Sequence, residues 1–402
     1  MTREVWITGI GITSSLGEGV DAHWQAMALA DRPKPVIDDK LCAPYLVHPL
    51  VPLDFDKQIP RRGDQRQMEN WQRVGTYTAG LALDDAGISG NAEILSRTHI
   101  VIGASGGERD MAVDAAILEG LLSTGSPEEF LNERLSNDLR PTLFLAQLPN
   151  LVAGNISIVH KVTGSSRTFL GEESAGASAL ETAVRRIRVG QGDIFLVGGV
   201  VIAERKDSLL ILVGGGWGWK GAPMSVWARP DKGGGVVMGS VAAFLVVEAR
   251  EHAEARGKKP YARLGSVLTD RCLRRPGEAA ANAKRQFAAI KAEASHKPLA
   301  VLSGANGVAD VTREEHNFLA GLISAGEVAT VRGTATMLGS CIEATFAAET
   351  GLAALALSRG GFYKPCDETG FETPVAEVPK GIVVTSWGIW RGESMGLVEA
   401  ID

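Results

Sequence analysis

Short apolar runs and longer alanine-rich stretches alternate along the whole chain. The apolar runs are rich in Val and Ile, end in Gly or another small residue, and predict buried strands at residues 5–8, 99–103, 194–198, 299–304 and 381–386. The alanine-rich stretches predict helices at residues 74–86, 175–189, 279–294 and 341–358. Strands that alternate with helices of this length indicate a layered α/β protein with a mostly parallel sheet.

The two halves of the chain echo each other weakly. Residues 174–183 and residues 336–345 each begin a predicted helix with Ala, Gly, Ser and Leu on every face. A helix of small residues fits where backbones approach closely, as in the middle of a layered sandwich, although any buried helix of an α/β protein has a similar composition. The repeat is therefore compatible with a duplicated architecture without requiring one.

Composition narrows the possible functions. The formal net charge is −6 and no strongly basic segment stands out, which argues against a nucleic-acid-binding protein. The four Cys are far apart and form no CxxC pair, so neither a metal site nor a secreted disulfide framework is predicted. The apolar stretch at residues 236–247 is too short to cross a membrane, and the start shows no signal-peptide pattern. We therefore expect a cytoplasmic protein without a membrane segment.

Two glycine-rich features lack a clear ligand. Gly9 and Gly11 form a GxG, but Ser14 occupies the place of the third glycine of a dinucleotide-binding motif, so no cofactor is predicted. The irregular segment at residues 214–223 is either a flexible surface loop or an interface loop anchored by Trp217 and Trp219.

Seven segments together resemble the β-ketoacyl-acyl-carrier-protein synthases, or ketosynthases. They follow the order and spacing of that family's landmarks at residues 5–17, 164–180, 190–199, 229–239, 303–307, 334–339 and 385–388. The resemblance implies a thiolase-like five-layered αβαβα sandwich built from two similar halves, with subunits paired as dimers. We place the halves at residues 1–250 and 251–402.

The resemblance also shows which chemistry is missing. Active ketosynthases carry a Cys nucleophile at a helix N-terminus, where the helix dipole favours the thiolate, together with two His and a Lys. Here the Cys position holds Glu173, the two His positions hold Asn306 and Thr336, and the Lys position holds Val331. Hence no catalytic residue of the family pattern remains.

The other candidate groups do not replace the missing ones. None of the seven His lies in a motif, and His316 is predicted to be a surface or helix-packing residue. Cys341 is predicted to be a small buried hydrophobe rather than a nucleophile.

We expect Glu173 to plug the former site or to form an ion pair across it. At a helix N-terminus its carboxylate should be ionised, while the neighbouring charge of Glu172 should raise one of the two pKa values. The family's flexible glycine loop reads Ile389, Trp390 and Arg391 between two glycines here, and these bulky side chains should stiffen the loop and fill the channel.

This pattern resembles a chain-length factor, a ketosynthase homologue that has lost the nucleophile and pairs with an active ketosynthase. Residues 167–176 resemble such subunits from bacterial aryl-polyene pathways. The resemblance implies a non-catalytic subunit of a type II polyketide or fatty-acid-like pathway. It would complete a heterodimer with an active ketosynthase, shape the acyl tunnel and meet the acyl carrier protein through the complex.

The strand at residues 194–198 is expected near the subunit contact, and the helix at residues 108–120 in the tunnel wall. The tunnel candidates on this helix recur at helical spacing, as an ordinary core stripe also would, and weaker candidates follow it: Met111, Ala115 and Leu118, then Leu143, Phe144 and Leu148. Two arginine clusters could dock an acidic carrier protein or could be solvated faces: Arg61, Arg62 and Arg66, and Arg185, Arg186 and Arg188.

Two other functions stay open. The first is an enzyme, either a malonyl-carrier decarboxylase or a residual acyltransferase that uses Glu173. The second is a homodimeric scaffold that binds an acyl ligand or a carrier protein.

Overall fold

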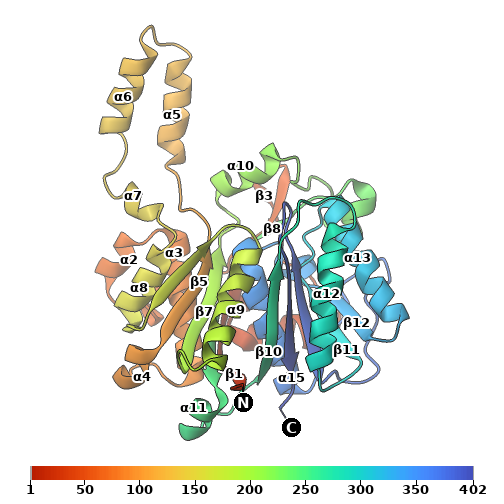
Figure 1. Ribbon diagram of the computed structural model, residues 1–402. Helices are drawn as coiled ribbons and strands as arrows, with labels where there is room; N and C mark the ends of the chain where they lie inside the picture. The colour runs from red at the N-terminus through yellow and green to blue at the C-terminus, as the bar shows by residue number, and fades with distance from the viewer. Residues whose placement is uncertain (1, 402) are drawn as a thin grey trace.

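The two halves of the chain build the same arrangement of strands, as the computed structural model of residues 2–401 shows (Figure 1). In the first half, the spatial order is β6-β5-β7-β9-β1, and in the second it is β12-β11-β13-β14-β10. In each half the second strand along the chain is parallel to the third and fourth, and the fifth is antiparallel to the fourth and first. The strands are β1 (Val5–Ser14), β5 (His99–Ala104), β6 (Ser166–Leu170), β7 (Ile194–Val201), β9 (Val241–Ala249), β10 (Ala262–Asp270), β11 (Leu299–Ser303), β12 (Val328–Gly333), β13 (Gly381–Trp387) and β14 (Glu393–Glu399).

Helices complete five layers around these strands. In the middle layer, α9 (Ser174–Arg188) packs on β5 and β10, and α15 (Thr345–Arg359) packs on β9 and β13, so each helix touches both halves. The outer layers contain α3 (Asn70–Ala86) and α8 (Leu151–His160) on the first half, and α12 (Glu278–Glu293) and α13 (Ala309–Ser324) on the second (Figure 1). The predicted thiolase-like sandwich is confirmed.

Close packing in the middle layer explains the small residues there. A Cβ atom added to Gly176 would come within 2.3 Å of the carbonyl oxygen of Glu343, so only glycine fits. This contact brings the first turn of α9 directly against the segment that precedes α15. The contact is the reason why Glu173 and Glu343, which are far apart in the sequence, lie in the same region of the molecule.

Three sequence predictions are corrected. The sheet is mixed rather than mostly parallel, because β13 and β14 form a hairpin whose short loop cannot provide a parallel crossover. The strand predicted at the subunit contact, residues 194–198, belongs to β7, which pairs with β5 and β9 and is buried along its length. The predicted helix at residues 341–358 begins only at Thr345, after the single turn η4 (Ile342–Ala344), so Cys341 is buried just outside it.

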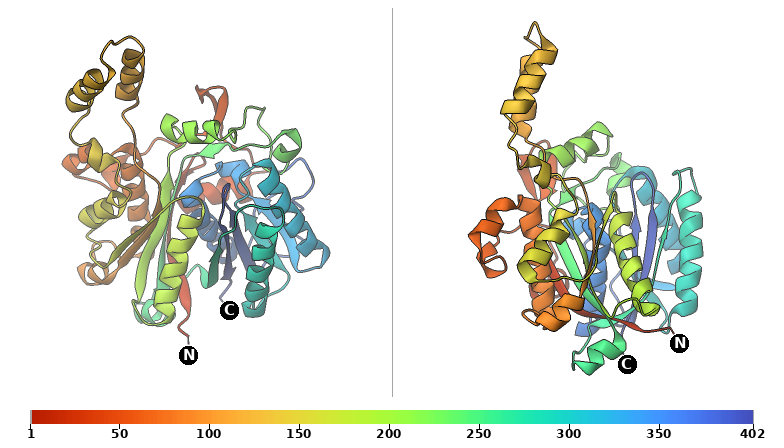
Figure 2. Two further views of the ribbon diagram at one scale, coloured as in Figure 1. Left: turned by 45° about the horizontal axis from the view of Figure 1, so that its top comes forward. Right: turned by 60° about the vertical axis from the view of Figure 1, so that its left-hand side comes forward.

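A helical hairpin projects from the body (Figures 1 and 2). It consists of α5 (Met111–Leu121) and α6 (Pro127–Asn137), and α7 (Leu143–Ala146) follows at its base. In this part of the molecule β6 forms the edge of the large sheet, and among the described residues it pairs with β5 alone. The edge strand and the hairpin are thus the unpartnered elements of the first half.

The remaining elements are short. A small sheet has the order β3-β4-β8, and β2 pairs with β1. No helix in the described part of the chain is long and apolar enough to cross a membrane. These elements are β2 (Gly17–Glu18), α1 (Gly19–Trp24), η1 (Gln25–Leu29), β3 (Asp38–Cys42), β4 (Tyr45–His48), η2 (Phe55–Lys57), α2 (Arg62–Gln67), α4 (Ala92–Arg97), α10 (Lys206–Gly214), η3 (Arg229–Lys232), β8 (Met238–Gly239), α11 (Arg250–Ala255) and α14 (Ala335–Leu338).

Candidate functional site

Glu173, which the sequence predicts to occupy the nucleophile position, lies at the N-terminus of the central helix α9. Its side chain is only 2% exposed. One carboxyl oxygen, Oε1, accepts a hydrogen bond from the backbone N–H of Ile389 at 3.3 Å, while Oε2 has no partner among the described residues. Glu173 is therefore buried and hydrogen-bonded to the loop between β13 and β14.

The protonation state of Glu173 differs from the expectation. Burial raises its pKa to about 7, and the charge of Glu172 raises it further, whereas backbone N–H groups and Arg274 act in the opposite direction. Desolvation outweighs the helix N-terminus, so the prediction of a simply ionised carboxylate is wrong. The ion pair forms one residue earlier, between Glu172 and Arg391 at 3.2 Å.

A second buried acid, Glu343, was missed by the sequence reasoning. It lies in η4, is 2% exposed, and its Oε2 also has no partner among residues 2–401. Burial raises its pKa to about 8, with a further contribution from the negative charge of Glu173. The sequence did offer a signal for this buried acid, because Glu343 is a charged residue inside the segment of small residues at 336–345.

The two buried acids line one cavity of about 140 Å³. Its wall is mainly apolar and includes Trp71 and Trp390. Glu172 and Arg205 also contribute to the wall, and no His or Cys is among the residues that line it in the described chain. The titratable groups that line this cavity are therefore carboxyl groups and one guanidinium.

The other three positions that the sequence predicts to be degenerate are Asn306, Thr336 and Val331, and they have structural surroundings. Asn306 is buried; its Nδ2 donates to the carbonyl oxygen of Trp387 at 3.0 Å, and its Oδ1 accepts from the N–H of Val308 at 2.9 Å. The hydroxyl of Thr336 accepts from the N–H of Val226 at 3.0 Å. Val331 is fully buried in β12. None of the three lines the cavity of Glu173.

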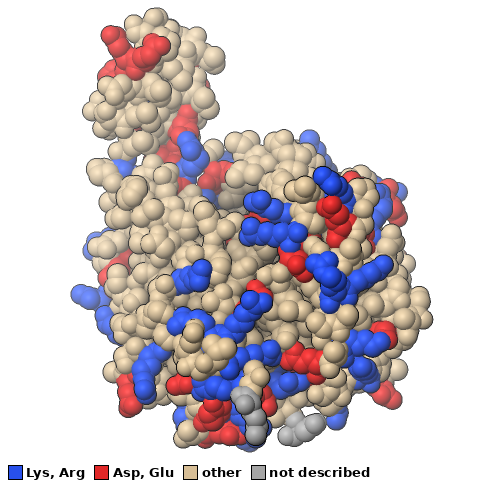
Figure 3. All heavy atoms as spheres, viewed as in Figure 1, with Lys and Arg blue, Asp and Glu red and all other residues tan. Residues whose placement is uncertain are grey.

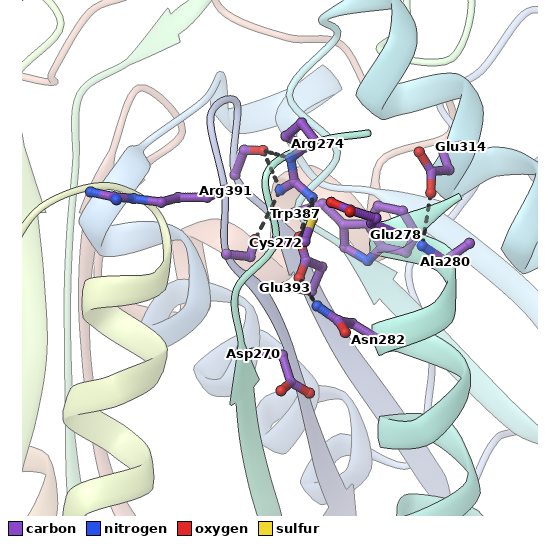
Figure 4. A network of polar contacts seen from close by, with 12 residues as sticks. Asp270, Cys272, Arg274, Glu278, Ala280, Asn282, Glu314, Trp387, Arg391 and Glu393 are labelled. Carbon is purple, nitrogen blue, oxygen red and sulfur yellow. Dashed lines mark hydrogen bonds and ion pairs between the residues drawn. The ribbon is translucent and has the colours of Figure 1, made fainter. Parts of the chain in front are cut away.

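Arg274 holds the loop at residues 388–392 in place (Figure 4). Its guanidinium donates through Nε to the Gly388 carbonyl oxygen at 3.0 Å and through Nη2 to that of Gly392 at 3.1 Å. The same group forms an ion pair with Glu393, whose side chain is fully buried. One side chain thus fixes both ends of the loop.

The three bulky loop residues have different surroundings. Ile389 is buried, and Trp390 lines the cavity while its ring meets Trp217 edge-on at a centroid distance of 4.7 Å. Arg391 does not line the cavity and points away from the network in Figure 4, toward its partner Glu172. Trp219 is buried, so both tryptophans of residues 214–223 anchor that segment inside this subunit.

The tunnel candidates are divided by the structure. Met111 and Leu118 line a groove of about 650 Å³ between the hairpin and α10. Four residues of this groove also line the cavity of Glu173, so the two spaces adjoin each other: Ser105, Arg205, Ser208 and Ile211. Ala115 and Phe144 are exposed, Leu143 is buried and Leu148 is half-buried, and these four do not line the groove.

The remaining candidates have structural surroundings. His316 packs against Trp227 and Phe371, and burial raises the pKa of Cys341 to about 12. Basic side chains gather over α9 and α12 in Figure 3, whereas the projecting hairpin carries few of them. The arginines of α9 have local partners, which are Glu181 for Arg185, Ser165 for Arg186 and Glu293 for Arg188, while Arg61, Arg62 and Arg66 are exposed.

Residues 2–253 match the family described as "Beta-ketoacyl synthase, N-terminal domain". The chain belongs to the β-ketoacyl synthase family. Among curated β-ketoacyl synthase relatives, it is 27% identical over 274 residues to 3-oxoacyl-[acyl-carrier-protein] synthase 2 of Vibrio cholerae. That alignment covers 65% of this chain and 61% of the relative. Nodulation protein E of Rhizobium leguminosarum bv. trifolii is 27% identical over 282 residues, which are 66% of this chain and 63% of the relative.

Solved structures of the β-ketoacyl synthase fold match over the full length. The ishigamide ketosynthase/chain length factor superposes with a TM-score of 0.79 and 19% identity, covering 100% of both chains. A β-ketoacyl synthase from Burkholderia phymatum gives a TM-score of 0.75 with 19% identity and the same coverage. The AntDE:AntF complex, a ketosynthase with a type II acyl-carrier protein, gives 0.71 with 17% identity, again over 100% of both chains. At these identities the likeness establishes the fold.

Proposed function

We propose that this chain is a non-catalytic, chain-length-factor-like subunit that pairs with an active ketosynthase of a type II polyketide or fatty-acid-like pathway. An aryl-polyene pathway is the specific assignment suggested by residues 167–176. The observation that carries the proposal is Glu173, a buried carboxyl bonded to the loop at the nucleophile position. The chain would complete the heterodimer, shape the acyl tunnel and meet the carrier protein through the complex. The repeated strand order supports dividing it into halves at residues 1–250 and 251–402.

The unpartnered surface of the first half supports a partner subunit. Leu118 is 66% exposed, Leu122 is 90% exposed and Phe144 is 66% exposed. Isolated apolar side chains are common on surfaces, but a projecting hairpin that carries several of them beside a free sheet edge is typical of an interface. A partner that covers the hairpin would also close the groove lined by Met111 and Leu118 and turn it into a tunnel.

Co-purification tests this assignment. We expect the chain to form a stable heterodimer with the ketosynthase encoded beside its gene when the two are produced together. Leu118→Asp should weaken that complex by at least about tenfold, because it places a charge in an apolar contact. Glu119→Gln, on the same helix at an exposed position, is the matched control. A homodimer that ignores the ketosynthase would contradict the proposal and favour the scaffold alternative.

One observation favours the enzymatic alternative. With a pKa of about 7, Glu173 is partly protonated at neutral pH and could donate a proton to a carbanion after decarboxylation. Asn306 and Thr336, at the positions of the two missing His, do not line the cavity of Glu173, so they are not placed to stabilise a thioester oxyanion beside it. We therefore expect no carbon dioxide release from malonyl-carrier protein by the purified chain. Release that Glu173→Ala abolishes would establish the decarboxylase instead.

A further inference from the structure

The carboxyl groups of Glu173 and Glu343 lie in one cavity, and no cation among residues 2–401 forms an ion pair with either of them. Each acid is 2% exposed, and each has one carboxyl oxygen without a hydrogen-bond partner among residues 2–401. Buried polar groups are nearly always satisfied, so two free oxygens in one cavity indicate a missing partner. Both side chains line the cavity, so a molecule inside it can reach them.

The cations around the cavity are already engaged. Arg391 pairs with Glu172 at 3.2 Å, Arg205 pairs with Asp207 at 2.6 Å, and Arg274 pairs with Glu393. Arg205 also donates to the carbonyl oxygens of Gly106 and Gly107, at 3.0 and 2.8 Å. The acids left over are therefore Glu173 and Glu343, and a positive charge is what the cavity lacks.

The shape and wall of the cavity limit the kind of cation. No group of three His, Cys, Asp or Glu in the described chain is arranged to hold a metal ion. A cavity of about 140 Å³ is close in size to apolar protein cavities that bind benzene, so it accepts roughly six non-hydrogen atoms. The wall supplies apolar surface from residues such as Val200, Leu212 and Met238, and two indole rings, from Trp71 and Trp390, that suit an organic cation.

We propose that this cavity binds a small primary alkylammonium ion. Its ammonium group lies between the free oxygens of Glu173 and Glu343, and its hydrocarbon body fills the apolar wall. The groove between the hairpin and α10 adjoins the cavity at Ser105 and Ser208, and we place the entry path on this side. The site is independent of the proposed partnership with a ketosynthase, because all its residues belong to this chain.

Binding should depend on pH. The pKa values of Glu173 and Glu343, raised to about 7 and about 8, mean that these acids carry protons near neutrality, and a bound ammonium ion must displace them. The charged groups around the acids are Glu172 with Arg391, Arg205 with Asp207, and Arg274 with Glu393. The amine stays protonated throughout this range, so its affinity should rise with pH.

Calorimetric titration of the purified full-length chain with cyclopentylamine tests the site, with cyclopentanol as the neutral probe of equal size. At about pH 8.5 we expect the amine to bind at least about tenfold more tightly than the alcohol. At about pH 6 the amine should bind about tenfold more weakly than it does at about pH 8.5. Glu173→Gln and Glu343→Gln should each weaken amine binding by about tenfold. Glu93→Gln, an exposed acid on α4, should have no effect.

The other outcomes overturn the proposal. Alcohol binding equal to or tighter than amine binding would show a neutral hydrogen-bonding pocket. No binding of either probe by the folded wild-type chain would show a cavity that holds only water. Because the titration contains no ketosynthase, its result is separate from that of the co-purification experiment.

Discussion

The free energy of unfolding is expected to fall by several kcal/mol between about pH 6.5 and about pH 8.5. The cause is a set of buried acids whose pKa values are raised by desolvation, to about 7 for Glu173 and Glu315 and about 8 for Glu343, with Glu349 raised well above its ordinary value. In the unfolded chain these groups ionise near pH 4.5, so at higher pH folding requires them to take up protons or to remain charged in a low-dielectric interior. Their stabilising contribution is complete below that value and is lost as the pH rises through the folded-state pKa values.

The chosen window separates these acids from the buried histidines. Burial lowers the pKa of His23 to about 4 and that of His48 to about 3, so these groups make stability rise with pH up to about 6.5, where the unfolded imidazoles lose their protons. Above that value the raised acids dominate. Chemical denaturation at a series of pH values measures the slope.

Glu343→Gln isolates one contribution to this slope. An amide of the same shape does not ionise, so the variant does not lose stability as the pH rises through the pKa of Glu343. Its advantage over the wild type at about pH 8.5 should be about 1.4 kcal/mol for each unit by which folding raises that pKa within the window. Glu93→Gln, exposed on α4, should leave the pH profile unchanged. Parallel profiles for the wild type and Glu343→Gln would show that Glu343 is ionised at little cost.

Arg274→Met is expected to destabilise the protein by about 3–5 kcal/mol. The substitution removes the counter-charge of the fully buried Glu393 and leaves its carboxylate with Asn282 at 2.6 Å and the Cys272 thiol at 3.2 Å. It also releases the carbonyl oxygens of Gly388 and Gly392, so the loop at residues 388–392 should exchange its amide hydrogens faster.

Two variants check this interpretation of Arg274. Arg274→Met combined with Glu393→Gln should recover much of the lost stability, because no unpaired buried charge remains. Arg285→Met removes an arginine of the same region that is 63% exposed and pairs with Asp270 at 3.3 Å, and it should cost less than about 1 kcal/mol. Equal losses of unfolding free energy for Arg274→Met and Arg285→Met would contradict the role of Arg274 in holding the loop and neutralising Glu393.

Much of the fold was predictable because it depends on local pattern. The apolar runs at residues 99–103 and 299–304 fall on β5 and β11, and the alanine-rich stretches at residues 175–189 and 279–294 fall on α9 and α12 to within one residue at each end. The pairing of the strands was harder to predict from the sequence. The edge strand β6 was missed because its sequence, Ser166–Leu170, is partly polar and largely exposed, whereas β7 is a continuous apolar run that is buried between two neighbours.

The sequence by itself determined the family likeness and supplied the prediction that the Cys, His, His and Lys positions are substituted, because both depend on which residue occupies each position of ordered motifs. Only the tertiary structure decided the chemistry of Glu173. Its pKa depends on burial, and burial depends on the loop at residues 388–392 and on η4, both of which are distant from α9 in the sequence. The pairing of Glu173 with Glu343 in one cavity is likewise a property of packing, since the close contact at Gly176 places them together.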